Sequence, residues 1–224
     1  MLTIVIPTIN EEKNIGRTLD KISLIKKIKI SEIIIVDDQS KDKTVEIISK
    51  YQKKMNIILI KNKKNMGLGY ALKKGFEIAK NKNVMFLDAD LSINIIDILK
   101  LGKLGKKNSM IIGSRYLKKS KIVGANYFKV KLSYFLNFFM CKVFNLNIID
   151  LSHSFRIISK DIKLDSLNFT HPGFFWEITI KAKKKGVHLE ELPITFRERK
   201  FGFSKNKSFK MLLSVLISLF NLLR

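Results

Sequence analysis

Residues 84–91 read VMFLDADL, and their first four residues form a short apolar run typical of a buried strand. The run ends in two carboxylates, Asp88 and Asp90, one residue apart. Side chains two residues apart point to the same side of extended backbone, so both carboxylates are expected to reach one divalent cation. Open α/β sheets bind ligands at this end of their strands. A lone Asp-x-Asp is more often part of an ordinary loop than a metal site, so the neighbouring motifs are needed to interpret it.

The rest of the first half repeats the order of strand, polar turn and helix. The other predicted strands are residues 2–7, 32–36, 56–60 and 110–113. Asn10 is the expected N-cap of a helix that runs to about residue 27. Gly67 and Gly69 open a later helix and allow a ligand to approach the backbone closely. Alternating elements of these lengths predict an α/β fold with a doubly wound, mainly parallel sheet.

The composition indicates one compact and strongly basic unit. The chain has 224 residues, 46% hydrophobic and only 3 proline, so long disordered linkers are not expected. Its single cysteine, Cys141, excludes an intrachain disulfide and a cysteine metal cluster. The N-terminus lacks the features of a signal peptide, so we expect the protein to face the cytosol. A net charge of +24 favours a polyanionic partner or an anionic membrane, with a purely compositional lysine bias as the alternative.

Arginine is used sparingly in this lysine-rich chain. Only six arginines occur, and four of them fall in loops or strand ends of the second half: Arg115, Arg156, Arg197 and Arg199. A guanidinium group binds phosphate through two hydrogen bonds at once, which lysine cannot do. These positions therefore favour a phosphate-rich site, with a structural ion pair as the alternative for any one of them.

Several motifs occur in the order and spacing of one enzyme family. In the first half they are PTINEE (7–12), VDDQSKDKT (36–44), NMGLGYALKKG (65–75) and LDADLS (87–92). These resemble the inverting glycosyltransferases of family 2, and the resemblance implies the GT-A fold. In the second half they are GSRY (113–116), DLSHSFR (150–156), GFFWEITIKAKKKG (173–186) and ELPITFRERKFGFSK (191–205). These look like the dolichol-phosphate mannosyltransferase branch, which moves a sugar onto a polyprenyl phosphate.

The resemblance implies a metal-dependent nucleotide-sugar site. The residues it places against the donor are Pro7, Thr8, Asn10, Glu11, Asp37, Asp38, Gly67, Asp88, Ala89 and Asp90. Asp88 and Asp90, with a weaker contribution from Ser92, would hold Mg²⁺ or Mn²⁺ against the donor diphosphate. For Asn10 and the Asp37-Asp38 pair, capping and turn formation are alternative or additional roles.

The implied acceptor is an anion and needs cations around it. A phosphate monoester is already charged at neutral pH, so no catalytic base is required. The residues expected around its phosphate are Arg115, Lys129, Ser133, Arg156 and Arg199, and the catalytic residues are expected to be Asp90, Arg199 and Lys205. Two positions depart from the family pattern: Lys129 stands where arginine is common, and His153-Ser154 replaces the usual Ser-Gly or Asn-Gly.

Two helices raise the question of a membrane. Residues 125–145 and 208–223 are broadly apolar, each with one narrow polar stripe, as in a core helix or a helix lying in a bilayer interface. The interfacial interpretation suits a lipid-tailed substrate. We therefore expect a glycosyltransferase domain (1–207) whose acceptor loop and interfacial helix lie at about 115–147, followed by a C-terminal amphipathic helix (208–224) too short to span a bilayer. This arrangement predicts a peripheral protein on the cytoplasmic face of a membrane.

Other functions remain open from the sequence. The resemblance favours transfer of mannose from GDP-mannose to dolichyl phosphate, but the base-reading residues form no readable code, so UDP-glucose is an alternative donor. A non-catalytic, basic membrane-binding protein is a less favoured alternative. No zinc-finger, RNA-recognition or helix-turn-helix pattern supports a nucleic-acid partner.

Overall fold

The computed structural model of the protein describes residues 1–90, 92–162, 173–199, 220 and 222. In chain order, the elements are β1 (Leu2–Thr8), α1 (Ile15–Ser23), β2 (Ile30–Asp37), α2 (Thr44–Gln52), β3 (Ile57–Lys61), α3 (Leu68–Ile78), β4 (Asn83–Phe86), α4 (Ile95–Gly102), β5 (Ser109–Ser114), β6 (Lys121–Val123), α5 (Tyr127–Val143), β7 (Arg156–Ser159), α6 (Phe174–Lys184), β8 (His188–Pro193) and β9 (Thr195–Arg197). The predicted helix at 208–224 lies outside the described residues apart from Phe220 and Leu222.

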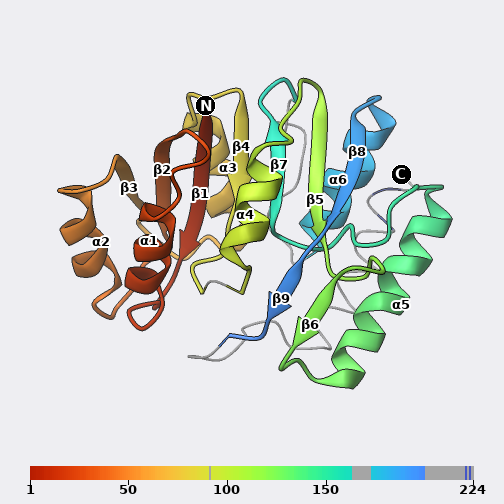
Figure 1. Ribbon diagram of the computed structural model, residues 1–224, viewed down its shortest axis with the longest axis horizontal. Helices are drawn as coiled ribbons and strands as arrows, with labels where there is room; N and C mark the ends of the chain where they lie inside the picture. Colours follow the sequence, from red (N-terminus) through yellow and green to blue (C-terminus); the bar gives the residue numbers. More distant parts are fainter. Residues whose placement is uncertain (91, 163–172, 200–219, 221, 223–224) are drawn as a thin grey trace.

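Seven of the described strands form one sheet in the order β3-β2-β1-β4-β7-β5-β8 (Figure 1). β1 pairs in parallel with β2 and β4, and β2 pairs in parallel with β3. β5 and β8 are also parallel, whereas β7 runs antiparallel to both β4 and β5. The predicted α/β fold with a mainly parallel sheet is therefore confirmed. The strand order reverses between β1 and β4, and ligand sites in such sheets lie outside the carboxyl ends of the strands at this point.

Alternating side chains of the central strands bury two hydrophobic cores, one on each face of the sheet. Val5 and Ile34 point into a core with α3, α5 and α6, while Ile4 and Ile35 point into a core with α1, α2 and α4. All four side chains are fully buried. Because both faces are covered, these strands read as continuous apolar runs rather than as alternating ones.

Two local expectations are wrong. α1 begins at Ile15 with Asn14 in the N-cap position, so Asn10 does not cap it. Asn10 instead adopts a left-handed backbone with φ of 52° and hydrogen-bonds the turn after β2. β4 ends at Phe86, so Asp88 and Asp90 lie in a turn beyond the strand rather than on extended backbone. What brings the two carboxylates together is therefore the turn and not the pleat of a strand.

α5 presents its polar stripe to the protein and its aromatic side chains outward. Ser133, Asn137 and Cys141 are buried, whereas Phe128 is 79% exposed and Phe135 61% exposed. The helix packs at the β5–β8 side of the molecule, beside the small sheet of β6 and β9 (Figure 1). Within the described residues, no helix combines the length and hydropathy that crossing a bilayer requires.

Candidate active site

Asp90 and Arg199 meet at the carboxyl edge of the sheet. The Nη2 atom of Arg199 lies 2.8 Å from Oδ2 of Asp90, and its Nη1 atom lies 3.6 Å from Oε1 of Glu11. The backbone nitrogen of Ser92 donates to the other carboxylate oxygen of Asp90 over 3.0 Å. Residues from the loops after β1, β4 and β9 thus converge on one point. Sequence reasoning placed all three charged residues in the active site, and the structure brings them together.

Asp88 lies next to this cluster in an environment that opposes its charge. Burial and the negative charge of Asp90 raise the pKa of Asp88 to about 6, although Arg199 and a hydrogen bond from Ser154 act against this rise. The Ser154 hydroxyl donates to Oδ2 of Asp88 over 2.6 Å. Two neighbouring carboxylates that repel each other, so that the pKa of one is raised, favour the binding of a cation between them.

The residues present fit a divalent metal ion. Asp88 and Asp90 supply the carboxylate oxygens that Mg²⁺ and Mn²⁺ prefer, and the Arg199 guanidinium already shows that this place attracts a cation. Ser92 is buried and contacts Asp90 through its backbone nitrogen, and the expected contribution of its hydroxyl to a metal site stays a prediction. The described chain holds no group of three or more His, Cys, Asp or Glu side chains suited to a metal. The residues that would hold a metal ion are thus the pair Asp88 and Asp90.

Two acidic residues, Asp37 at the end of β2 and Asp38 after it, hold together the loops that carry the predicted donor residues. Asp37 accepts hydrogen bonds from the Thr8 hydroxyl and from the backbone and hydroxyl of Ser40. Asp38 accepts from the backbone nitrogens of Met66 and Gly67, each over 2.8 Å. Both carboxylates are buried in the protein. Their predicted contact with a nucleoside stays a prediction, and the turn-forming role is the one the structure displays.

The loop after β1 is held against the turn after β2. The Asn10 side chain accepts from the backbone nitrogen of Lys41 over 2.8 Å, and the Glu11 backbone nitrogen donates to the Thr44 hydroxyl over 2.7 Å. Pro7 lies next to the last residue of β1, directly before the buried Thr8 that ends the strand. These contacts place the predicted donor residues of two separate motifs side by side. Ala89 completes this edge, and its carbonyl accepts a hydrogen bond from Thr18 of α1.

Arg115 lies in a second cluster, on the loop that follows β5. Its Nε and Nη2 atoms each lie 2.8 Å from a different carboxylate oxygen of Asp150, a bidentate pair. Burial acts to raise the pKa of Asp150, but the Arg115 guanidinium keeps it below the usual range. The segment that carries Asp150 also carries Ser154, which hydrogen-bonds Asp88. One short loop therefore connects the Arg115–Asp150 pair to the pair of carboxylates Asp88 and Asp90.

The prediction that Arg156 binds the acceptor phosphate is contradicted by its burial. Its side chain is 0% exposed and lies over the Phe175 ring, 4.6 Å from the centroid. Its guanidinium donates to the carbonyls of Leu151 and His153 and to the Thr179 hydroxyl. Arg156 thus fixes the 151–156 turn from inside the core, which is the structural alternative that the sequence left open.

The remaining predicted acceptor residues lie on or beyond α5. Lys129 is exposed in the first turn of α5, and Ser133 is buried one turn further on. The Tyr116 ring, next to Arg115, makes an edge-to-face contact with Tyr134 of α5 at 5.3 Å between centroids. α5 and the Arg115 cluster are therefore neighbours, as expected. Lys205 lies outside the described residues.

Sequence reasoning missed the residues that hold Arg115 in place. Asp150 and Ser152 belong to the DLSHSFR motif and Asn137 to the polar stripe of α5, but none was given a role. Glu191 of β8 was missed as well, although it begins another of the quoted motifs. The available signal was the position of these polar residues inside family-like motifs and in the polar stripe of an otherwise apolar helix.

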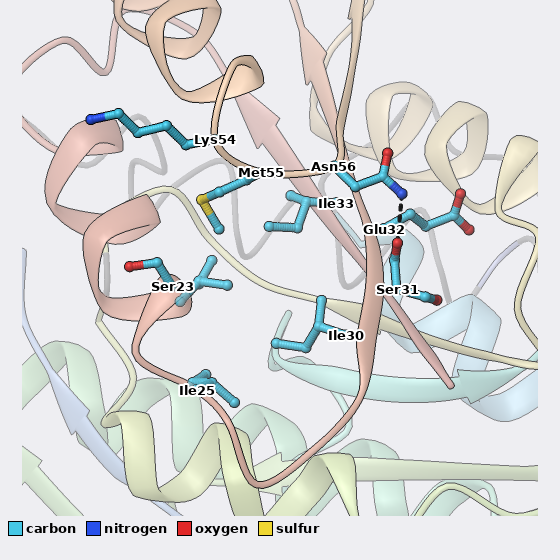
Figure 2. A pocket seen from close by; sticks show the side chains of 10 residues that line it. Ser23, Ile25, Ile30, Ser31, Glu32, Ile33, Lys54, Met55 and Asn56 are labelled. Carbon is cyan, nitrogen blue, oxygen red and sulfur yellow. Dashed lines mark hydrogen bonds between the residues drawn. The ribbon is translucent and has the colours of Figure 1, made fainter.

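A pocket of about 250 Å³ opens at the opposite, amino edge of the sheet (Figure 2). Its lining mixes apolar residues such as Ile25 and Ile30 with polar ones such as Ser31 and Asn56. Its carboxylate, Glu32, accepts hydrogen bonds from the Thr3 hydroxyl and the Lys80 backbone nitrogen. Since that charge is already engaged within the fold, the pocket adds nothing to the site at the carboxyl edge.

Comparison with known families identifies the family of this chain. Residues 3–164 match the family model described as glycosyl transferase family 2, and the chain belongs to this family. An uncharacterised protein of Methanocaldococcus jannaschii is 31% identical over 96% of this chain and 90% of its own length. A dolichyl-phosphate beta-glucosyltransferase of Trichomonas vaginalis is 30% identical over 88% of this chain and 66% of its own length.

Solved structures share the fold at much lower identity. Glucosyl-3-phosphoglycerate synthase from Mycobacterium tuberculosis, in complex with Mn²⁺, UDP and glucosyl-3-phosphoglycerate, superposes with a TM-score of 0.72. The identity is 15%, and the match covers 99% of this chain and 79% of that enzyme. Its complex with Mn²⁺, UDP and phosphoglyceric acid gives a TM-score of 0.73 at 16% identity. The expected GT-A fold is therefore confirmed.

Proposed function

We propose that this protein transfers a hexose from a nucleotide sugar to the phosphate of a polyprenyl phosphate, with inversion at the anomeric carbon. The observation that carries the proposal is the loop of residues 150–156. Through Ser154 it contacts Asp88 of the carboxylate pair, and through Asp150 it holds Arg115. A place for a metal-bound diphosphate and a place for an anionic acceptor thus lie at the two ends of one short segment.

The reaction needs charge neutralisation more than proton transfer. An oxygen of the acceptor phosphate attacks the anomeric carbon, the new C–O bond forms, and the bond to the nucleoside diphosphate breaks with its electron pair on the diphosphate oxygen. Because the attacking phosphate is already anionic, no side chain has to remove a proton. Two anions must nevertheless approach each other, and Arg115 and Arg199 supply cations on either side of the reaction centre.

Asp88 and Asp90 would hold the divalent cation, which supplies charge stabilisation for the departing diphosphate. Two complexes of the Mycobacterium tuberculosis synthase support this role, since that enzyme was solved with Mn²⁺ and UDP. Glu11 and Arg199 border the same carboxylates and orient the groups around them. Ser154 keeps Asp88 in place and favours its charged form.

Two nucleotide sugars are candidate donors. The dolichyl-phosphate beta-glucosyltransferase of Trichomonas vaginalis, at 30% identity over 88% of this chain, supports UDP-glucose. GDP-mannose, which the sequence motifs favoured, is the second candidate. Dolichyl phosphate is the proposed acceptor in both cases.

A membrane surface is the proposed place of the reaction, because the acceptor carries a lipid tail. The outward face of α5 supports this, with Phe128, Phe135 and Phe138 exposed between lysines. Lys131 lies 5.4 Å from the ring centroid of Tyr127, as expected of a basic side chain at a headgroup boundary. Attachment to the cytoplasmic face stays a prediction.

The deciding experiment measures transfer of label from UDP-glucose and, in parallel, from GDP-mannose to dolichyl phosphate in detergent with Mn²⁺. We expect label in the organic phase from one donor, lost with a chelator and in an Asp90→Asn variant. No label from either donor, with metal-dependent binding of a nucleotide sugar retained, would refute the acceptor. Absence of nucleotide-sugar binding would instead favour a non-catalytic, basic membrane-binding protein.

A further inference from the structure

Asp150 is the centre of a hydrogen-bond network around Arg115. Its carboxylate is fully buried and accepts from the backbone nitrogen of Arg115 over 3.0 Å as well as from Nε and Nη2 over 2.8 Å each. A bidentate pair of this kind is the strongest arrangement between a carboxylate and a guanidinium. It fixes the plane of the guanidinium as well as its position.

The network is anchored in two elements distant in sequence. Glu191 of β8 accepts from the backbone nitrogens of Ile149 and Asp150, each over 2.8 Å. Asn137 of α5 donates to the Ser152 hydroxyl over 2.9 Å and accepts from the Ser152 backbone nitrogen over 3.1 Å. The Ser152 hydroxyl in turn accepts from Nη2 of the guanidinium over 3.1 Å. The loop therefore cannot shift without breaking bonds to both the sheet and α5.

Arg115 keeps one donor outside this network. No residue in the described part of the chain accepts a hydrogen bond from its Nη1 atom, and 17% of its side chain is exposed. The guanidinium lies 4.9 Å from the ring centroid of Tyr116 and 6.0 Å from that of Phe196. Aromatic rings and the carboxylate thus confine the group on several sides, while Nη1 remains for a ligand.

We propose that Asp150 is the positioning residue that presents Arg115 to the phosphate of the acceptor; this inference rests on the proposed function. Without Asp150, a largely buried guanidinium would lack a counter-charge and would turn toward water, because an unpaired buried charge is costly. The Asp150 carboxylate weakens the attraction of Arg115 for an anion, but it fixes the orientation of the Arg115 guanidinium. In a site that must align two anions, a fixed orientation of the guanidinium group contributes more than a stronger attraction for the anion.

The test is a double-mutant cycle of Asp150→Asn and Arg115→Gln, with KM measured separately for donor and acceptor. We expect Asp150→Asn to raise the acceptor KM by about ten- to a hundredfold, the loss of hydrogen bonding to a charged group. The donor KM should stay within about twofold, and the double variant should resemble Arg115→Gln alone because the two residues act as one unit. Additive effects, an equal loss for donor and acceptor, or a lower acceptor KM would overturn the proposal.

A gentler variant and a binding measurement complete the test. If Asp150→Asn does not fold, Ser152→Ala removes one partner of Nη2 and should raise the acceptor KM by about threefold or more, the loss of one hydrogen bond; an unchanged value overturns the proposal. If the wild type transfers sugar to no polyprenyl phosphate, the proposed function has failed. Binding of soluble citronellyl phosphate, followed by NMR, then decides: weaker binding in Asp150→Asn and Arg115→Gln supports the positioning role, and absent or equal binding overturns it.

Discussion

Arg199 binds Asp90 with 2.8 Å between Nη2 and Oδ2, and the two residues are 109 positions apart in the chain. The pairing depends on β9, because the backbone nitrogen of Arg197 donates to the carbonyl of Ser92 over 2.8 Å. A strand-end hydrogen bond thus fixes the arginine beside the turn that carries the carboxylates. Arg199 and a metal ion would approach the same carboxylate of Asp90.

Replacing Arg199 with glutamine should therefore strengthen the binding of Mn²⁺ to the nucleotide-free protein. A cation that competes for Asp90 is removed, and we expect a gain of about tenfold in affinity, measured by EPR titration of free Mn²⁺. Lys54→Gln, at the pocket on the opposite edge, is the control that removes a charge without touching the site. Unchanged or weaker binding in Arg199→Gln would mean that the arginine does not compete with metal.

The affinity for Mn²⁺ should fall as the pH drops below about 6. Burial and the charge of Asp90 raise the pKa of Asp88 to about 6, so below this pH Asp88 is protonated and must lose its proton before it can bind metal. The expected decrease is about tenfold per pH unit for one proton released. Titrations between about pH 5 and 8 measure it, and an affinity independent of pH would contradict the role of Asp88.

Ser154→Ala is the matched variant for this measurement. The Ser154 hydroxyl donates to the charged form of Asp88, which lowers the pKa of that carboxyl. Loss of the hydroxyl should raise the pKa of Asp88 further, so the fall in affinity should begin at a higher pH. A shift in the opposite direction would show that Ser154 does not stabilise the carboxylate.

Gly67→Ala and Gly186→Ala form a matched pair that separates strain from function. Both glycines have positive φ, 86° and 76°, and an added Cβ would meet no atom within 4 Å at either position. Each alanine should lower the free energy of unfolding by about 1 kcal/mol, because the left-handed backbone disfavours a side chain. Urea unfolding measures this equal cost.

Only Gly67→Ala should also weaken the binding of UDP or GDP. The backbone nitrogen of Gly67 donates to Asp38 at the carboxyl edge of the sheet, whereas Gly186 lies in the turn between α6 and β8 at the amino edge. Isothermal titration with each nucleotide and Mn²⁺ gives the comparison. Equal binding by both variants would remove Gly67 from the donor site.

The sequence predicts the sheet from its alternating strand and helix patterns, and its resemblance to a family predicts that Asp88, Asp90 and Arg199 converge on one site. The sequence could not predict that Arg156 is buried in the core. Both Arg156 and Arg115 are arginines in family-like motifs, so the sequence does not distinguish them. Packing against Phe175 and a hydrogen bond to Thr179 place Arg156 in the core, whereas Arg115 remains at the candidate site. The direction of the α5 stripe was open for the same reason. A helix with one polar stripe can turn it either way, and Asn137 turns it inward through its bonds to Ser152.

That orientation makes the outer face of α5 a testable membrane contact. Phe128 is 79% exposed and Phe135 61% exposed, so their replacement by glutamate should leave the core intact. We expect the double variant Phe128→Glu and Phe135→Glu to bind phosphatidylserine-containing vesicles about tenfold or more weakly. Two aromatic rings that would insert into the bilayer are lost, and two negative charges are added. Vesicle co-sedimentation measures this effect, and raised salt should weaken the wild type as well.

Leu24→Glu is the control for a charge placed on exposed apolar surface elsewhere. Leu24 is 70% exposed at the end of α1, on the face of the sheet opposite to α5. Its variant should bind vesicles almost as the wild type does, apart from the general effect of one added negative charge. If all variants lose binding equally, the overall charge of +24 and not the aromatic face of α5 accounts for the attraction to the membrane.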